Sequence, residues 1–168
     1  MFQDEARCGR IADPSRCWAP PTCRPDVPAQ IVREYTYLYG ALSPKDGKAD
    51  FLILPAMDGA CMSAFLKELS QRYPDTYLAI FWDGAPCHQP GAITIPDNIW
   101  LEKLPPRSPD LNPQENIWDD MRESFFNNTL FNSMEAVETQ LITAARFYEA
   151  NPKHVQSIAG WHGIVSTL

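Results

Sequence analysis

The segment YLAIFWD at residues 77–83 is the stretch that decides the fold class. Residues 77–82 form a continuous apolar run of strand length, which is typical of a strand covered on both faces of a sheet. The run leads straight into Asp83, and a carboxylate at the end of an apolar strand is costly unless it is paired or bound to a cation. The segment therefore predicts a buried strand with a functional candidate at its carboxyl end, although Asp83 could also be only a turn residue before Gly84.

Strands and helices follow one another on both sides of this segment. We expect strands over residues 31–42, 51–54 and 99–104. Asp58, Asn112 and Ser133 are expected to cap three helices, with Pro113 at the first position of the second. The apolar residues recur at helical spacing after each cap: Met62, Phe65, Leu66, Leu69 and Tyr73, then Ile117, Trp118, Met121 and Phe125, then Met134, Val137, Leu141, Ala144 and Tyr148. With a short N-terminal strand, this order predicts one mixed α/β domain over residues 1–168.

Composition excludes several classes of protein. The chain has 168 residues with 14 basic and 21 acidic side chains, a net charge of −7, and a hydrophobic content that suits a single globular domain. The acidic balance argues against binding nucleic acid through bulk charge, but a metal site can reverse the local sign. No apolar run approaches the roughly 20 residues of a membrane helix, and no basic-then-apolar leader is present. We therefore expect a cytoplasmic protein without a membrane partner, whose odd number of cysteines are reduced thiols.

Proline is concentrated in two parts of the chain. Of the 16 prolines, five lie between positions 14 and 28 and seven between positions 86 and 113. Proline fixes φ and removes a backbone donor, so both regions are expected to be loops. We place the first proline-rich loop at residues 9–30.

Three acidic residues stand out by their context: Asp4, Asp83 and Glu115. Magnesium prefers hard oxygen ligands, and two ions held by carboxylates can stabilise both the attacking and the leaving oxygen in phosphoryl transfer. Each residue also has a simpler interpretation. Asp4 could be a surface acid, and Glu115 could only complete a capping box with Asn112. His88 could be an ordinary loop histidine.

Three motifs in this order resemble the catalytic domain of DDE transposases, specifically the bacterial insertion-sequence branch of the Tc/mariner superfamily. They are DEARCG at residues 4–9, DGAPCH at 83–88 and LPPRSPDLNPQENIW at 104–118. The segment REYTYLYGALSPKDG at residues 33–47 is also similar to the region this family places between its first two acids. The resemblance covers nearly the whole chain.

The resemblance implies an RNase H-like mixed sheet flanked by helices, with a site for two Mg²⁺ or Mn²⁺ ions. Asp4, Asp83 and Glu115 would be the catalytic, metal-binding residues. His88 would contact a phosphate or a metal ligand, and two motif residues, Asn112 and Trp118, would be structural as a cap and a core anchor. The implied function is metal-dependent DNA cleavage and strand transfer in transposition, with transposon ends and a TA target as partners. The active form would be a homo-oligomer, bacterial and nucleoid-associated.

Members of this family carry helix-turn-helix DNA-binding modules ahead of the catalytic domain. Here only Met1, Phe2 and Gln3 precede Asp4. We therefore expect a truncated first strand and no N-terminal DNA-binding module, as in a fragment, a split-frame product or a decayed copy. Two other functions stay open at this point: a non-catalytic remnant that pairs with a full-length transposase, and another RNase H-like nuclease.

Overall fold

The computed structural model describes residues 1–12, 16, 18–27, 29–83, 93–106 and 108–165. Its centre is a five-stranded sheet with the strand order β3-β2-β1-β4-β5. The strands are β1 (Phe2–Ala12), β2 (Gln30–Leu42), β3 (Ala49–Leu54), β4 (Leu78–Trp82) and β5 (Ile99–Lys103). β1 pairs antiparallel with β2, and β2 antiparallel with β3, whereas β4 pairs parallel with both β1 and β5. The predicted mixed α/β sheet is confirmed.

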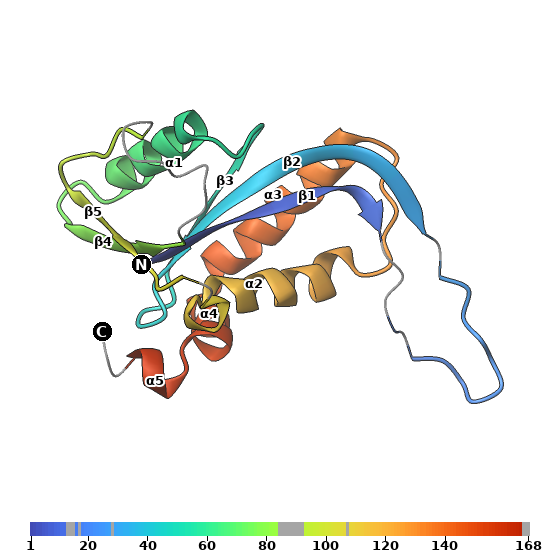
Figure 1. The fold of residues 1–168 in the computed structure, drawn as a ribbon. Coiled ribbons are helices and arrows are strands. Elements are labelled where there is room, and N and C mark those ends of the chain that lie inside the picture. Colours follow the sequence, from blue (N-terminus) through green and yellow to red (C-terminus); the bar gives the residue numbers. More distant parts are fainter. Residues whose placement is uncertain (13–15, 17, 28, 84–92, 107, 166–168) are drawn as a thin grey trace.

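Helices cover both faces of this sheet, as Figure 1 shows. α1 (Gly59–Arg72) lies on one face. α2 (Gln114–Met121) and α3 (Met134–Ala150) lie on the other, where α4 (Pro152–Ala159) also packs against them. A short 3-10 turn (Pro109–Leu111) precedes α2, a π-helical turn (Arg122–Phe126) follows it, and α5 (His162–Val165) comes after α4.

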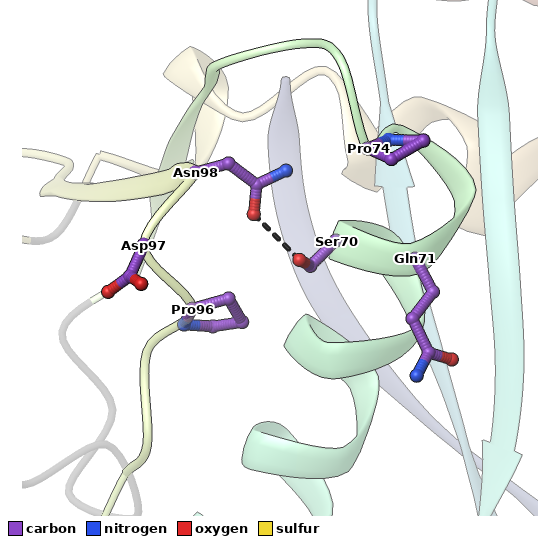
Figure 2. Close-up of a pocket in the computed structure, with 6 residues that line it drawn as sticks. All are labelled: Ser70, Gln71, Pro74, Pro96, Asp97 and Asn98. Atoms are coloured by element: carbon purple, nitrogen blue, oxygen red, sulfur yellow. Dashed lines mark hydrogen bonds between the residues drawn. The ribbon is translucent and has the colours of Figure 1, made fainter.

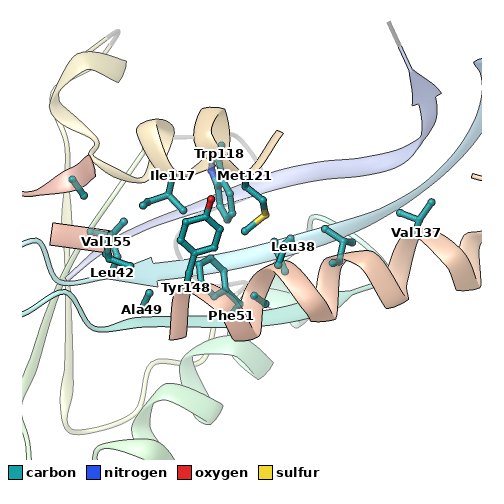
Figure 3. Packing of buried hydrophobic residues seen from close by; sticks show 14 of the residues in the cluster. Leu38, Leu42, Ala49, Phe51, Ile117, Trp118, Met121, Val137, Tyr148 and Val155 are labelled. Carbon is teal, nitrogen blue, oxygen red and sulfur yellow. The ribbon is translucent and has the colours of Figure 1, made fainter. Parts of the chain in front are cut away.

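Two hydrophobic clusters form the core, one on each side of the sheet. Successive side chains of a strand point to opposite faces, and β2 supplies both clusters in this way: Leu38 packs with α2 and α3, and Tyr39 packs with α1. In the first cluster, shown in Figure 3, Phe51 of β3 lies against Trp118 and Tyr148. The sheet is therefore a layer buried between helices at the C-terminal end of β2, over residues 38–42.

The caps at two helix starts are confirmed. The Asp58 carboxylate accepts a hydrogen bond from the backbone N–H of Cys61 at 2.8 Å, and the Ser133 hydroxyl accepts one from Ala136 at 3.2 Å. The third helix differs in detail. Its cap residue is Pro113, and the Asn112 side chain accepts from the N–H of Gln114 at 3.2 Å.

The bounds of one predicted loop need correction. The proline-rich loop predicted at residues 9–30 is shorter at both ends, because β1 runs to Ala12 and pairs with β2 as far as Gln30. Proline begins only at position 14, so nothing before it removes a donor from the ladder. β1 begins at Phe2, two residues before Asp4, and is 11 residues long because it continues past Asp4. In Figure 1 the β1–β2 ribbon extends away from the body of the sheet.

Cys8, Cys23 and Cys61 are free, and Cys17 and Cys87 lie outside the described residues. Within that part of the chain, every helix is too short or too polar to cross a membrane.

Candidate metal and DNA-processing site

Asp4 is placed on the sheet by β1, opposite Gly40 of β2. Its side chain points toward α2, since the indole Nε1 of Trp118 donates a hydrogen bond to Asp4 Oδ2 at 3.0 Å. Trp118 itself is buried in the core on that side of the sheet. Sequence alone could not distinguish Asp4 from a surface acid. In the folded chain its carboxylate is partly buried and is bonded to a residue of α2.

Glu115 reaches the same region from the first turn of α2. Two contacts fix α2 on β1: Trp118 bonds to Asp4, and the Asn112 side-chain amide donates to the Gln3 carbonyl oxygen at 3.2 Å. Glu115 lies between these two anchors in the sequence and is close enough to Asp4 to raise its pKa. A cavity of about 360 Å³ borders Glu115 and is lined by Asp110, Asn112, Glu115, Asn116, Asp119 and Trp161.

Asp83 directly follows β4, and the strand register relates it to Asp4. Phe2 pairs with Phe81 in the parallel β1–β4 ladder, and their rings stack with centroids 5.2 Å apart. Side chains two residues apart in a strand share a face. Asp4 and Asp83 each come two residues after this pair, although β4 itself ends at Trp82, one residue before Asp83.

The electrostatics of Asp4 are those of an uncompensated negative charge. Burial is the largest effect, and the neighbouring charge of Glu115 adds to it; together they raise the pKa of Asp4 from 3.8 to about 7. Hydrogen bonds from the Glu5 backbone and from Trp118 act in the opposite direction. Glu115 and Glu5, whose charges both raise this pKa, are acidic. A cation bound here would relieve the repulsion that otherwise favours a proton.

The donor set suits a hard divalent cation, because carboxylate oxygens are the ligands that Mg²⁺ prefers. Among the described residues, however, no three His, Cys, Asp or Glu side chains lie close enough together to form a metal cage. The structure brings Asp4 and Glu115 together, whereas Asp83 is an exposed residue that directly follows β4. His88 lies outside the described residues.

Three features of this region were missed by sequence reasoning. Trp118 was expected to be only a core anchor, but its N–H contacts the first acid. Gln114 is fully buried, and within the described structure both polar atoms of its amide lack a hydrogen-bond partner. Gly40 lies under both side chains, since a Cβ added there would be 2.6 Å from Gln114 Nε2 and 2.7 Å from Trp118 Cη2. A strand glycine is a known sign of close approach, but its partner is visible only in three dimensions.

A second cavity, of about 530 Å³, lies away from these residues between the end of α1 and the segment before β5 (Figure 2). Ser70 donates to Asn98 there at 2.6 Å, and the Asn98 amide bonds to the carbonyl oxygens of Tyr73 and Thr76. These contacts fasten the two segments together, so we assign this cavity a structural role.

Comparison with known proteins agrees with the resemblance seen in the motifs. The model of the family described as DDE superfamily endonuclease matches residues 1–138. A protein of Sinorhizobium fredii (strain NBRC 101917 / NGR234), "Uncharacterized protein y4pE/y4sA", is 34% identical over 125 residues, covering 74% of this chain and 93% of that protein.

Solved structures of Mos1 transposase share the fold. The pre-cleavage Mos1 transpososome superposes with a TM-score of 0.67 at 17% identity, covering 99% of this chain and 54% of the Mos1 chain. The Mos1 catalytic domain gives a TM-score of 0.59 at 15% identity, covering 99% and 80% of the two chains. Two Mos1 paired-end complexes are described with Mn and with Mg. The chain thus spans about half the length of the Mos1 chains in these complexes.

At these identities the Mos1 structures establish the RNase H-like catalytic fold, and the family match covers most of the sequence, including all three acids. Fold, motif order and family match agree, and the chain belongs to the DDE superfamily endonuclease family, with a fold that is shared by Mos1 transposase.

Proposed function

We propose that this domain cleaves DNA strands and transfers them in DNA transposition, using two Mg²⁺ or Mn²⁺ ions held by Asp4, Asp83 and Glu115. One observation carries the proposal: β1 and α2 bring two carboxylates from distant parts of the chain together, and the charge of Glu115 raises the pKa of Asp4. Such an arrangement is electrostatically unfavourable unless a cation completes it. The Mos1 complexes described with Mn and Mg support the choice of ion.

Each residue would have a distinct part in this chemistry. Trp118 holds Oδ2 of Asp4, and the anchored start of α2 holds Glu115 close to that carboxylate. Asp83 would complete the set from the adjacent strand. When bound, the divalent ions would activate the attacking oxygen and stabilise the leaving 3′ oxygen of a phosphodiester. His88 is proposed to contact a phosphate or a metal ligand.

The proposed partner is DNA, first a transposon end and then a TA target, a step that is easily unstacked. Mos1 transposase, whose fold this chain shares, is described in a paired-end complex with the left transposon end. Because the chain covers about half of that protein, we propose that transposon-end recognition needs additional sequence and that the active form is an oligomer. The net charge of −7 is consistent with a domain that holds DNA mainly through its metal site.

Calorimetric titration with Mn²⁺ tests the proposal, on the wild-type chain and on Asp83→Ala, each with and without a short DNA duplex. We expect binding to the wild type that is lost in Asp83→Ala and kept in Asp75→Asn, a control in an exposed turn. Asp83→Asn should in addition abolish duplex cleavage by a protein that carries the DNA-binding modules. Binding or cleavage that survives the Asp83 substitutions would show that the site assignment is wrong.

A non-catalytic remnant that pairs with a full-length transposase is the second candidate. It is favoured by one observation, the absence of a complete three-ligand group among the described residues. A folded wild-type chain that binds no Mn²⁺, even with DNA present, would make this the better function. Cleavage of RNA–DNA hybrids or junctions in preference to transposon ends would instead indicate another RNase H-like nuclease.

A further inference from the structure

The contact between Trp118 and Asp4 does more than fill the core. An indole N–H is a donor and never an acceptor, so it fixes one carboxylate oxygen and favours the charged form of the acid. Trp118 comes three residues after Glu115, one turn further along α2, and residues so spaced lie on the same face of a helix. Helix α2 therefore carries Glu115 in its first turn and holds Asp4 through Trp118 in its next turn.

This contact depends on the absence of a side chain at Gly40, on the face of the sheet that α2 covers. Gly40 pairs with Asp4 across β1 and β2, and directly paired residues in an antiparallel sheet have Cβ positions only about 5 Å apart. A Cβ at Gly40 would lie 2.7 Å from Cη2 of Trp118, well inside van der Waals contact. The indole therefore occupies the space that any other residue would fill, and this position brings its Nε1 to Asp4.

We infer that Trp118 is a positioning residue for Asp4, and that Gly40 is the position that lets it reach the carboxylate. The inference rests on the proposed function, since it assigns Trp118 a role in holding a metal ligand. Groups that hold a metal ligand by hydrogen bonds typically affect metal affinity by about 10- to 100-fold. If Trp118 served only for packing, phenylalanine would replace it without changing metal affinity.

Calorimetric titration with Mn²⁺ separates these two roles. Trp118→Phe keeps an aromatic ring and removes the N–H, and Trp100→Phe is the matched control, since Trp100 is 57% exposed on β5. We expect Mn²⁺ affinity to fall about 10- to 100-fold in Trp118→Phe and to stay at the wild-type value in Trp100→Phe. Equal affinity in the wild type and Trp118→Phe would overturn the inference and leave the proposed function intact.

A second measurement needs no metal. It tests the inference even if Trp118→Phe does not fold. It also does so if the wild type binds no Mn²⁺, a result that would refute the proposed function. The indole N–H resonance of Trp118 is followed by ¹H–¹⁵N NMR, with the exposed Trp100 as an internal reference. In Asp4→Asn, which replaces a charged acceptor with a neutral one, the Trp118 resonance should move and that of Trp100 should not. Gly40→Ala should also move it, because the added Cβ displaces the ring. An unmoved Trp118 resonance in Asp4→Asn would overturn the inference.

Discussion

Replacing Asp4 by asparagine is expected to stabilise the metal-free domain at neutral and alkaline pH. The substitution removes the charge and keeps the shape of the side chain. Burial and the charge of Glu115 raise the pKa of Asp4 from 3.8 to about 7 in the folded chain. An acid with a higher pKa in the folded than in the unfolded state favours folding when protonated. Its contribution is fully present below the unfolded pKa and is lost as the pH rises through the folded pKa.

The magnitude follows from the two pKa values. A pKa difference of one corresponds to about 1.4 kcal/mol. Raising the pKa from 3.8 to about 7 therefore destabilises the wild type by at most about 4 kcal/mol, a value that is reached at pH values above the folded pKa. Roughly half of this, about 2 kcal/mol, should develop between about pH 5.5 and pH 8. The free energy of unfolding of Asp4→Asn should therefore exceed that of the wild type at about pH 8, by an amount that falls toward about pH 5.5.

Urea denaturation in the presence of a chelator, followed by fluorescence across this pH range, measures the difference directly. Asp75→Asn is the control, because a substitution in this exposed turn should change the free energy of unfolding little. Adding Mn²⁺ should reduce the stability advantage of Asp4→Asn over the wild type. A ligand at about 100 times its Kd stabilises the protein that binds it by about 2.7 kcal/mol, and Asp4→Asn should gain little. A stability difference that does not change with pH, or that favours the wild type without metal, would refute this account of Asp4.

Three other substitutions test the packing around the site. Gln114→Leu should raise the free energy of unfolding by about 1 kcal/mol or more, because it removes a buried amide whose polar atoms have no partner in the described structure; a lower urea midpoint would contradict this. Tyr148→Phe should cost about 1 to 2 kcal/mol in thermal denaturation, since its hydroxyl donates to Asp120 at 2.5 Å, and an unchanged melting temperature would show that the bond adds nothing. Gly47→Ala should lower the melting temperature by several degrees, because Gly47 has φ of +71° and an added Cβ would lie 2.0 Å from the Pro152 carbonyl oxygen; calorimetry that finds no loss would mean that the turn rearranges.

Local sequence determined most of the secondary structure. The continuous apolar run at residues 77–82 is β4, and Asp58 and Ser133 cap helices at the predicted positions. These features could be predicted because caps, turns and apolar periodicity act over a few residues. The motif order further indicated the family, which the comparison with known proteins confirms.

Contacts between distant segments decided where some strands and helices end and how the site residues are arranged. The end of β1 at Ala12 depends on pairing with β2, and the start of α2 depends on Asn112, whose amide also bonds to Gln3. The sequence singled out Asp4 and Glu115 but could not show that one helix and one strand bring them together. The reason is physical: the pKa of Asp4, its bond from Trp118 and the space over Gly40 all arise from burial between layers. Residue type and spacing specify which chemical groups the chain carries. Only tertiary packing specifies which of these groups lie together in a partly buried, charged environment.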